Sequence, residues 1–453
     1  MRLTDSGNAE RLIEMCGDIV LYCPPMRAWY IWNGRVWRED TNNSIYQLAK
    51  KVARSYLHDA EELDKDDYNR AKILRWAASS ESLRGIQATV SLAQSNEEVY
   101  CGVDEFNRNP MLFNVENGTI DLSTGRFRLF DPADRITKYA PVTYVKGATC
   151  PIWDKFLADV LPDPDTREFI RVAVGYSLTA SVDEDKMFIL HGGGRNGKTT
   201  FVNTILGLMG AYGSQASSEL IIRKRNSGPK DDLFVLMGKR FVAATETEES
   251  HRLDENLIKQ MTGGNKISIN PKYRSQLEFY PTWKLWLDTN YEPIITGTDN
   301  AIWSRIIKVP FQVTIPREKR DTGLKKYLMT DLSERSGILN WAIEGARKWN
   351  ASGLRTSKEI TELTAMYRTE QDLTGQFLSE VCHMCRGSVV SKDVLYSEYV
   401  GYCRRINETP KSKNAFGHDT LQRGIKETRT SNNRYWQDVS MDTSVSLLPC
   451  DAV

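Results

Sequence analysis

The chain lacks the long apolar runs and the cysteine framework that mark membrane proteins and disulfide-rich secreted domains. No segment of its 453 residues approaches the about 18 consecutive apolar residues needed to span a membrane. The N-terminus begins MRLTD and has no apolar centre typical of a signal peptide. Eight cysteines are scattered without a regular spacing, which favours reduced thiols. We therefore expect a cytoplasmic protein with no membrane partner.

An excess of charge of one sign is also missing. The 60 Lys and Arg residues nearly balance the 59 Asp and Glu residues, for a net charge of +1. Nucleic-acid binding would therefore need local basic surfaces, because no global field would attract a polyanion. Only five histidines are present, and none has the context of a nucleophilic triad. The length allows two to four domains.

A glycine-rich motif is the most informative feature that is present. It follows the apolar run 187–190 and precedes a segment with helical periodicity, 200–206. Strand, glycine-rich loop and helix are the context of a phosphate-binding loop, so ATP is the expected ligand. Lys198 is expected to reach the β- and γ-phosphates, and the Thr199 hydroxyl to bind Mg²⁺. The expected nucleotide-binding residues are Gly192, Gly193, Gly194, Arg195, Asn196, Gly197, Lys198, Thr199 and Thr200.

Acidic residues follow the next predicted strand. Residues 241–245 have the pattern of a short buried strand, and Glu246-Thr247-Glu248-Glu249 comes directly after it. In doubly wound sheets, ligands bind at the carboxyl ends of the strands. Glu246 is our first candidate for holding Mg²⁺ and polarising the attacking water, with Glu248 as the second. A solvated acidic turn is the alternative.

Two further segments carry single candidate residues. Residues 283–287 predict a third strand that runs into Asp288-Thr289-Asn290, where the Asn290 amide could sense the γ-phosphate. Arg305 interrupts the apolar segment 301–311, and a cation in such a segment needs a partner. That partner is either an internal carboxylate or the nucleotide of a neighbouring subunit, and the sequence alone favours neither.

A β-hairpin is predicted between the second and third strands. In the segment 267–279, two flanks alternate in polarity on either side of Asn270-Pro271. Lys272 lies at the predicted tip and Arg274 just beyond it. A lysine at such a tip is usually only solvated, but several tips that line the pore of a ring could grip a phosphate backbone.

The ordered set of these motifs resembles that of a known family. The motifs are GGGRNGKTT, TETEES, LIKQMTGGNKI, KLWLDTN and WSRIIKVPF. They resemble superfamily-three helicases, and in particular the helicase half of phage and plasmid primase–helicases, which are related to the poxvirus primase–helicase. The resemblance extends outside the motifs, for example to WYIWNGRVW at 29–37 and NPMLFNV at 109–115, and covers most of residues 1–400.

This resemblance implies a homo-hexameric ring that hydrolyses ATP with Mg²⁺ and moves on single-stranded DNA from 3′ to 5′. Carried over by position, Lys198 and Thr199 bind phosphate and Mg²⁺, and Glu246 is the acidic residue of the second motif. Asn290 becomes the sensor, Lys272 the DNA contact of the pore, and Arg305 an arginine finger that acts in trans. The expected setting is the cytoplasm of a bacterial host that carries a phage or mobile element.

The family pattern also leaves an alternative function open. Many relatives carry an N-terminal primase domain, and the first 150 residues show no paired-carboxylate primase site. A separate primase or polymerase is therefore an expected partner. The alternative function is a nucleotide-gated ring ATPase that binds an origin or recruits a primase without unwinding DNA.

The expected fold class is α/β, with an AAA+-like P-loop core between two smaller domains. We expect an α+β N-terminal domain over 1–150, the ATPase over 151–350, and a small winged-helix-like domain over 351–453. Within the first domain, residues 1–40 and 105–145 read as β-rich and residues 45–94 as helical, with turns at Asn33-Gly34 and Asn117-Gly118. Within the ATPase, residues 223–230 form a basic loop that either contacts DNA or is simply exposed.

The C-terminal part suggests a helix–turn–helix followed by a wing. Residues 393–407 and 414–428 are helical in pattern, and 432–436 could form the wing. Arg404, Lys413 and other basic residues suit phosphate contacts, but a domain that caps the ring or docks a partner explains the region equally well. Cys382 and Cys385 lack a second ligand pair for zinc and are expected to be buried core residues.

Overall fold

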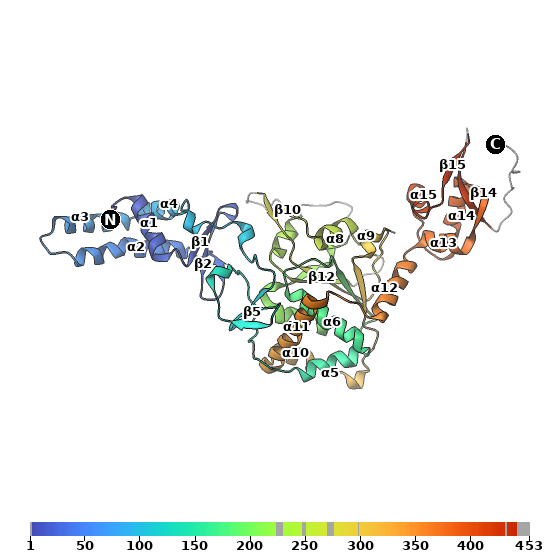
Figure 1. The fold of residues 1–453 in the computed structure, drawn as a ribbon, viewed down its shortest axis with the longest axis horizontal. Helices are drawn as coiled ribbons and strands as arrows, with labels where there is room; N and C mark the ends of the chain where they lie inside the picture. Colours follow the sequence, from blue (N-terminus) through green and yellow to red (C-terminus); the bar gives the residue numbers. More distant parts are fainter. Residues whose placement is uncertain are drawn as a thin grey trace.

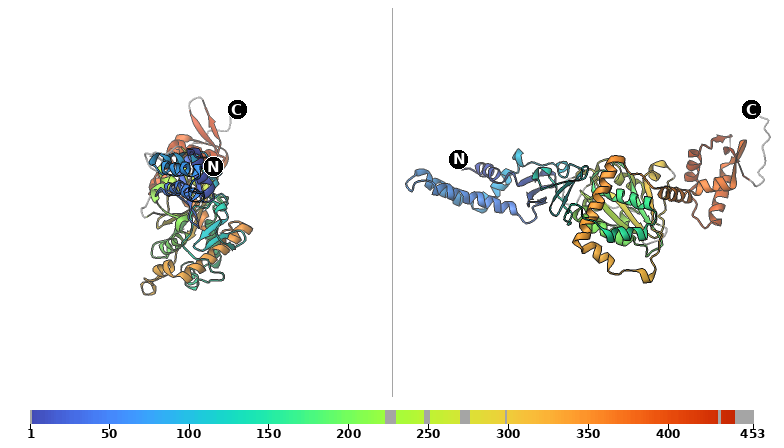
Figure 2. Two further views of the ribbon diagram at one scale, coloured as in Figure 1. Left: turned by 90° about the vertical axis from the view of Figure 1, so that its left-hand side faces the viewer. Right: turned by 60° about the horizontal axis from the view of Figure 1, so that its bottom comes forward.

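The computed structural model describes residues 2–222, 230–246, 251–269, 276–297, 299–430 and 433–441. Three parts follow one another along the longest axis of the molecule (Figure 1). A helical N-terminal part lies at one end, an α/β core in the middle, and a small C-terminal unit at the other end. The helix α12 (Lys358–Glu370) connects the core to the C-terminal unit, and the view in Figure 2 shows the two terminal parts on opposite sides of the core.

The N-terminal part begins with a helix, so the prediction of a β-rich segment over 1–40 is wrong for its first residues. Helix α1 spans Asp5–Cys16, and the Thr4 hydroxyl caps it by accepting a hydrogen bond from the Gly7 N–H. Leu12, Ile13 and Cys16 are buried at helical spacing. The aromatic residues farther along favour strands, so the sequence predicted strands for the whole segment although its first residues have helical periodicity.

The rest of this part follows the predicted order. The strands β1 (Val20–Cys23), β2 (Ala28–Trp32) and β3 (Trp37–Glu39) form an antiparallel sheet. Asn33 and Gly34 make the predicted turn, in which Asn33 Oδ1 accepts hydrogen bonds from the N–H groups of residues 35 and 36. The predicted helical stretch comprises the helices α2 (Ser44–Glu61), α3 (Tyr68–Ser80) and α4 (Leu83–Ala93). A second antiparallel sheet contains β4 (Leu112–Val115), β5 (Gly118–Asp121) and β6 (Arg126–Arg128).

The core is built on a parallel five-stranded sheet, which confirms the predicted α/β class. Its strand order is β13-β7-β12-β9-β8, and all four pairings are parallel. The strands are β7 (Met187–His191), β8 (Gly213–Ser217), β9 (Phe241–Glu246), β12 (Lys284–Thr289) and β13 (Ile306–Pro310). Near-continuous apolar runs form the central strands because both faces of the sheet are buried.

Alternate residues of the strands enter two different hydrophobic cores. Phe188 and Trp286 face the core formed with helices α5, α6, α7, α10 and α11, and their rings stack at 4.2 Å. The indole N–H of Trp286 donates to Ser177 Oγ at 3.1 Å. The helices of this face are α5 (Pro151–Val160), α6 (Pro164–Leu178), α7 (Lys198–Met209), α10 (Leu324–Thr330) and α11 (Leu332–Ser352).

Met187, Val242 and Leu285 point to the opposite face of the sheet. There they pack with α8 (Glu255–Thr262), α9 (Asn300–Trp303), the hairpin strands β10 (Ile267–Ile269) and β11 (Leu277–Phe279), and residues of the N-terminal sheet. The antiparallel pairing of β10 with β11 confirms the two flanks of the predicted hairpin. The boundaries of the three domains remain a prediction.

The C-terminal unit differs from the sequence interpretation in two places. It contains α13 (Leu373–Val381), α14 (Lys392–Arg405), α15 (Lys413–Gln422) and a sheet of β14 (Cys382–Ser391), β16 (Arg434–Met441) and β15 (Glu427–Arg429). The helix predicted over 414–428 ends early because Gly424 has a φ of +83° and stops it. Cys382 is buried as expected, but Cys385 is exposed, since it lies in the irregular part of β14 between Met384 and Val389, where the pairing with β16 is interrupted.

Within the described ranges, no helix is long and apolar enough to cross a membrane. The same part of the chain holds no group of three or more His, Cys, Asp or Glu side chains placed to bind a metal ion.

Candidate functional site

The glycine-rich loop lies at the carboxyl edge of the parallel sheet, between β7 and α7. Gly194 and Gly197 have φ angles of +92° and +87°, which favour glycine. Gly197 precedes the first turn of α7, and a Cβ there would lie 2.8 Å from Val160 Cγ1. The first N–H groups of a helix have no partner within it. Together with the helix dipole, these groups of α7 favour an anion beside the loop.

The ammonium of Lys198 connects this loop to the neighbouring strand β12. Its Nζ donates to the Gly192 carbonyl at 2.7 Å, to Asn290 Oδ1 at 3.0 Å and to Asn196 Oδ1 at 3.1 Å. The side chain is almost wholly buried, and burial lowers the pKa of Lys198, while the charge of Asp288 acts in the opposite direction. The predicted phosphate-binding lysine and the predicted sensor Asn290 are thus in direct contact.

Asp288 is a site residue that sequence reasoning missed. It is 4% exposed, and its Oδ2 accepts a hydrogen bond of 3.1 Å from the Thr199 hydroxyl. Burial raises the pKa of Asp288, and both Lys198 and the bond from Thr199 oppose that shift. Carboxylate and hydroxyl oxygens are ligands that Mg²⁺ prefers. The available signal was a carboxylate placed directly after the buried run 285–287, where a charge needs a partner.

Glu246 ends the strand next to Asp288. Its backbone pairs with Thr289 of β12, and Thr289 also pairs with His191 at the end of β7. The last residues of these three strands therefore lie side by side at the edge that carries the loop. The side chain of Glu246 and the whole of Glu248 lie outside the described residues. Lys272, Arg274 and the basic loop residues 223–229 lie outside them as well.

The other residues predicted to bind the nucleotide differ in their exposure and in their contacts. Gly193 and Gly194 have open space where a side chain would be, with no atom within 4 Å of an added Cβ. Asn196 is buried, and its amide nitrogen donates to the Phe311 carbonyl at 2.6 Å, which fixes the loop to the end of β13. Arg195 is exposed and has a φ of +55°. Thr200 lies in the first turn of α7 and is half-buried.

Arg305 lies at the amino ends of the strands, opposite the carboxyl ends that carry the glycine-rich loop. It immediately precedes β13, and its carbonyl accepts a hydrogen bond from the N–H of Met187, the first residue of β7. Its guanidinium donates to Thr262 Oγ1 at 3.2 Å and lies 3.5 Å from Asp185 Oδ2. The length of the strands therefore separates Arg305 from the Lys198 of its own chain. Any contact with a nucleotide would have to involve another subunit.

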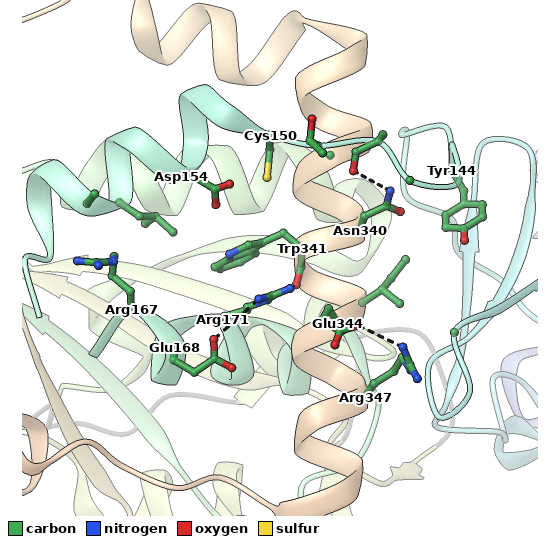
Figure 3. Close-up of a pocket in the computed structure, with 18 of the residues that line it drawn as sticks. Tyr144, Cys150, Asp154, Arg167, Glu168, Arg171, Asn340, Trp341, Glu344 and Arg347 are labelled. Carbon is green, nitrogen blue, oxygen red and sulfur yellow. Dashed lines mark hydrogen bonds and ion pairs between the residues drawn. The ribbon is translucent and has the colours of Figure 1, made fainter. Parts of the chain in front are cut away.

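A cavity of about 810 Å³ lies on the helical face, between α5, α6 and α11 (Figure 3). Three arginines and three carboxylates line it: Asp154, Arg167, Glu168, Arg171, Glu344 and Arg347. Arg167 donates to the carbonyls of residues 161 and 162, and Arg347 to Glu344 at 3.2 Å. Arg171 donates to the Trp341 carbonyl at 3.2 Å. Since each guanidinium already has partners and the charges balance, this cavity offers no net attraction to an anion.

Comparison with known protein families gives two matches. Residues 9–162 match the family described as D5 N terminal like, and residues 190–305 match a family of unknown function, DUF5906. The second match begins at the end of β7 and ends at Arg305, so it contains the loop, Asp288 and Asn290.

Several proteins of large DNA viruses are similar to this chain. "Putative helicase L207/L206" of Acanthamoeba polyphaga mimivirus is 25% identical over 386 residues, which is 79% of this chain and 40% of the viral protein. "Putative primase C962R" of African swine fever virus (strain Badajoz 1971 Vero-adapted) is 24% identical over 301 residues, 61% of this chain and 31% of that protein. The chain therefore spans two fifths or less of the length of these relatives.

Among solved structures, the apo C-terminal region of NrS-1 shares the fold. The match has a TM-score of 0.50 at 10% sequence identity and covers 94% of this chain and 98% of that one. At this identity, the likeness concerns the arrangement of helices and strands alone.

Proposed function

We propose that this chain is an ATP-dependent DNA helicase of the D5-like primase–helicase type, which works in the replication of a phage or other mobile element. The match over 9–162 and the names of the viral relatives support the broader role of a replication helicase or primase. The observation that carries the ATPase is the contact set of Lys198, which joins the glycine-rich loop to Asn290 and Asp288 at one edge of the sheet.

The residues at this edge fit a nucleoside triphosphate with Mg²⁺. The glycine-rich loop and the start of α7 supply backbone N–H groups and a positive dipole end, and Lys198 supplies an ammonium for the β- and γ-phosphates. The Thr199 hydroxyl and the Asp288 carboxylate, 3.1 Å apart, would hold the metal, with Glu246 beside them. Bound Mg²⁺ would neutralise charge that develops on the phosphates. Asn290 would orient the attacking water, with Glu246 to polarise it.

A ring of subunits would complete this site. Arg305 and the glycine-rich loop lie at opposite edges of the sheet, so one subunit could present its Arg305 to the nucleotide of the next. An arginine supplied in trans stabilises transition-state charge during phosphoryl transfer. Lys272 and Arg274, on the segment that joins β10 to β11, are the proposed DNA contacts in the pore of that ring.

Arg305→Ala is expected to lower ATP hydrolysis about 1000-fold, and a mixture with Lys198→Ala subunits is expected to restore part of it. In mixed rings, an intact nucleotide site of the first variant would meet the intact arginine of the second. Steady-state ATPase assays on a series of mixing ratios measure this recovery.

Asp185→Asn is the matched control for Arg305. It removes the carboxylate that pairs with Arg305, and asparagine tolerates the φ of +54° at this position. We expect its hydrolysis to stay within about twofold of the native rate. A loss as large as that of Arg305→Ala, without recovery in mixed rings, would instead assign Arg305 to an internal ion pair.

The proposed function predicts that single-stranded DNA accelerates ATP hydrolysis. The test measures phosphate release with and without an oligonucleotide of about 30 thymidines, at two salt concentrations, because phosphate contacts weaken as salt rises. Stimulation that falls with salt supports a DNA motor. Hydrolysis that DNA leaves unchanged in both conditions would contradict it.

A further inference from the structure

A second cavity, of about 1360 Å³, forms a groove where the N-terminal sheet meets the hairpin β10–β11. Two large rings on its wall are open to solvent, since Tyr100 is 50% exposed and Tyr280 is 54% exposed. The ammonium of Lys266 lies 5.4 Å from the centre of the Tyr280 ring. Exposed aromatic rings beside cations are the features on which the bases of a single strand stack.

Lys138 also lines this groove, and its ammonium pairs with no carboxylate of the described residues. Among the described residues, no hydrogen bond or ion pair of its ammonium is found, and its nearest charged neighbours are two further cations, Lys239 and Arg240. The side chain packs tightly against Gly238, where an added Cβ would lie 2.8 Å from Lys138 Cε. Burial and the two cations lower the pKa of Lys138 to about 8.

The neighbouring cations hydrogen-bond to backbone carbonyls. Arg240 is 2% exposed and donates to the carbonyls of Leu178 and Leu112 at 2.6 and 2.8 Å. Lys239 donates to two carbonyls at 2.9 Å, and the buried Lys284 to the carbonyls of Thr179 and Ser181. Carbonyl dipoles solvate the charges of Lys239 and Arg240 without neutralising them, whereas burial lowers the pKa of Lys284 well below its usual value. The positive potential beside Lys138 is therefore maintained.

Carboxylates are present on the wall and rim of the groove. They are Glu39, Asp104, Asp183 and Glu278. Glu278 is 4.0 Å from Lys266, and Asp183 accepts a hydrogen bond from Ser181 and lies close enough to influence Lys284. Arg38 and Arg108 add positive charge to the same wall. The lining thus holds four cations, Lys138 included, and four carboxylates, so its formal charges balance. The positive charge beyond that balance comes from Lys239 and Arg240, which lie next to Lys138.

We propose that this groove binds single-stranded DNA, with a backbone phosphate on the Lys138 ammonium and bases stacked on Tyr100 and Tyr280. A strand that alternates flat bases with phosphates matches a groove whose lining combines exposed rings with a lysine that has no ion pair among the described residues. The groove lies at the amino edge of the sheet, where Arg240 precedes β9 and Lys284 begins β12, and is therefore separate from the nucleotide site. It would guide the strand between the N-terminal part and the core. The assignment of DNA rests on the proposed function.

The test compares Lys138→Met with Lys146→Met, which removes the same charge from an exposed position outside the groove. Fluorescence anisotropy with a labelled oligonucleotide of about 30 thymidines gives the Kd over a range of salt concentrations. Lys138→Met should raise the Kd about tenfold, and one lost phosphate contact should reduce the salt slope by about 0.7. Tyr280→Leu should also raise the Kd about tenfold, with the salt slope unchanged. Lys138→Arg should bind as the native protein does.

Thermal stability separates lost binding from lost folding. An unfolded lysine has a pKa of about 10.4. The folded value of about 8 means that burying the charge destabilises the protein fully below pH 8 and progressively less as the pH rises towards 10. Lys138→Met should therefore raise the Tm by about 2–4 °C at pH 7, and by less at pH 9.5.

Equal Kd values and salt slopes for Lys138→Met and Lys146→Met would overturn the proposal. So would displacement of the oligonucleotide by polyglutamate at the same charge concentration as by unlabelled DNA, because the site would then be one for acidic peptides. The native protein could bind the oligonucleotide in this groove and yet show no DNA-stimulated ATPase. That result would contradict the helicase and leave the groove intact, so the two failures are distinguishable.

Discussion

ATP hydrolysis by Lys198→Ala is expected to fall at least about 100-fold below that of the native protein. The substitution removes an ammonium that is only 3% exposed and that donates to the loop carbonyl of Gly192 and to the Asn290 amide. No other cation of the described residues contacts these acceptors, so no neighbour replaces its charge on the phosphates. Phosphate release under saturating ATP and Mg²⁺ measures the loss.

Lys146→Ala is the control for this experiment, because Lys146 is exposed and no hydrogen bond or ion pair of its side chain is found among the described residues. It should hydrolyse ATP at the native rate. Circular dichroism and the Tm of both variants check that the sheet has formed. If a folded Lys198→Ala protein retained more than about a tenth of the native turnover, the loop would not be the ATPase site.

Asp288→Asn is expected to produce a second loss of about 100-fold, together with a higher Mg²⁺ requirement. The amide keeps the shape of the side chain and an oxygen that can accept the hydrogen bond from Thr199. It removes the negative charge that lies 3.9 Å from Lys198 and beside the proposed metal ligand. A titration of hydrolysis against Mg²⁺ concentration separates weaker metal binding from slower turnover at saturation.

The exposed Asp66 provides a matched substitution, since no interaction of its side chain is found among the described residues. Asp66→Asn should leave both the rate and the Mg²⁺ dependence unchanged. If Asp288→Asn behaved in the same way, Asp288 would have a structural role only, and the metal would have to be held by Thr199 and Glu246.

The strands of the core could be predicted because both faces of the sheet are buried. Residues 187–190, 241–245 and 283–287 form short apolar runs bounded by polar residues, and the structure places β7, β9 and β12 over them. Helix α1 was missed, although Leu12, Ile13 and Cys16 have the spacing of a buried helical face. The signal was present but is short, and the tryptophans that follow favour strands.

Only part of the candidate site was accessible from the sequence. The motif around Lys198 and the amide of Asn290 could be identified as single features, but their 3.0 Å contact depends on the pairing of β7 with β12. Asp288 was overlooked because a carboxylate at a strand end resembles a solvated turn until the neighbouring strand is known. The position of Lys138 gave no signal at all, since only the tertiary structure places it next to Lys239 and Arg240 and away from the carboxylates of the described residues.

Arg305 has two candidate roles, an ion pair within the chain and a contact with the nucleotide of a neighbouring subunit. A guanidinium within an apolar segment predicts a partner, and Asp185 meets that need within the chain. Arg305 also lies at the amino ends of the strands, away from its own Lys198, and this position suits a contact with the nucleotide of another subunit. Mixing of variant subunits decides between the two roles because it changes the partner of Arg305 without changing its own fold.

Strand displacement is the most direct test of a translocating helicase. A labelled strand is annealed to duplexes that carry either a 3′ or a 5′ single-stranded tail, and its release is followed with ATP, without ATP, and with Lys198→Ala. We expect ATP-dependent release from the 3′-tailed duplex alone, and none by Lys198→Ala. ATP hydrolysis that DNA stimulates, with no strand released from either duplex, would contradict this expectation and indicate a ring ATPase that assembles on DNA or recruits a primase without unwinding.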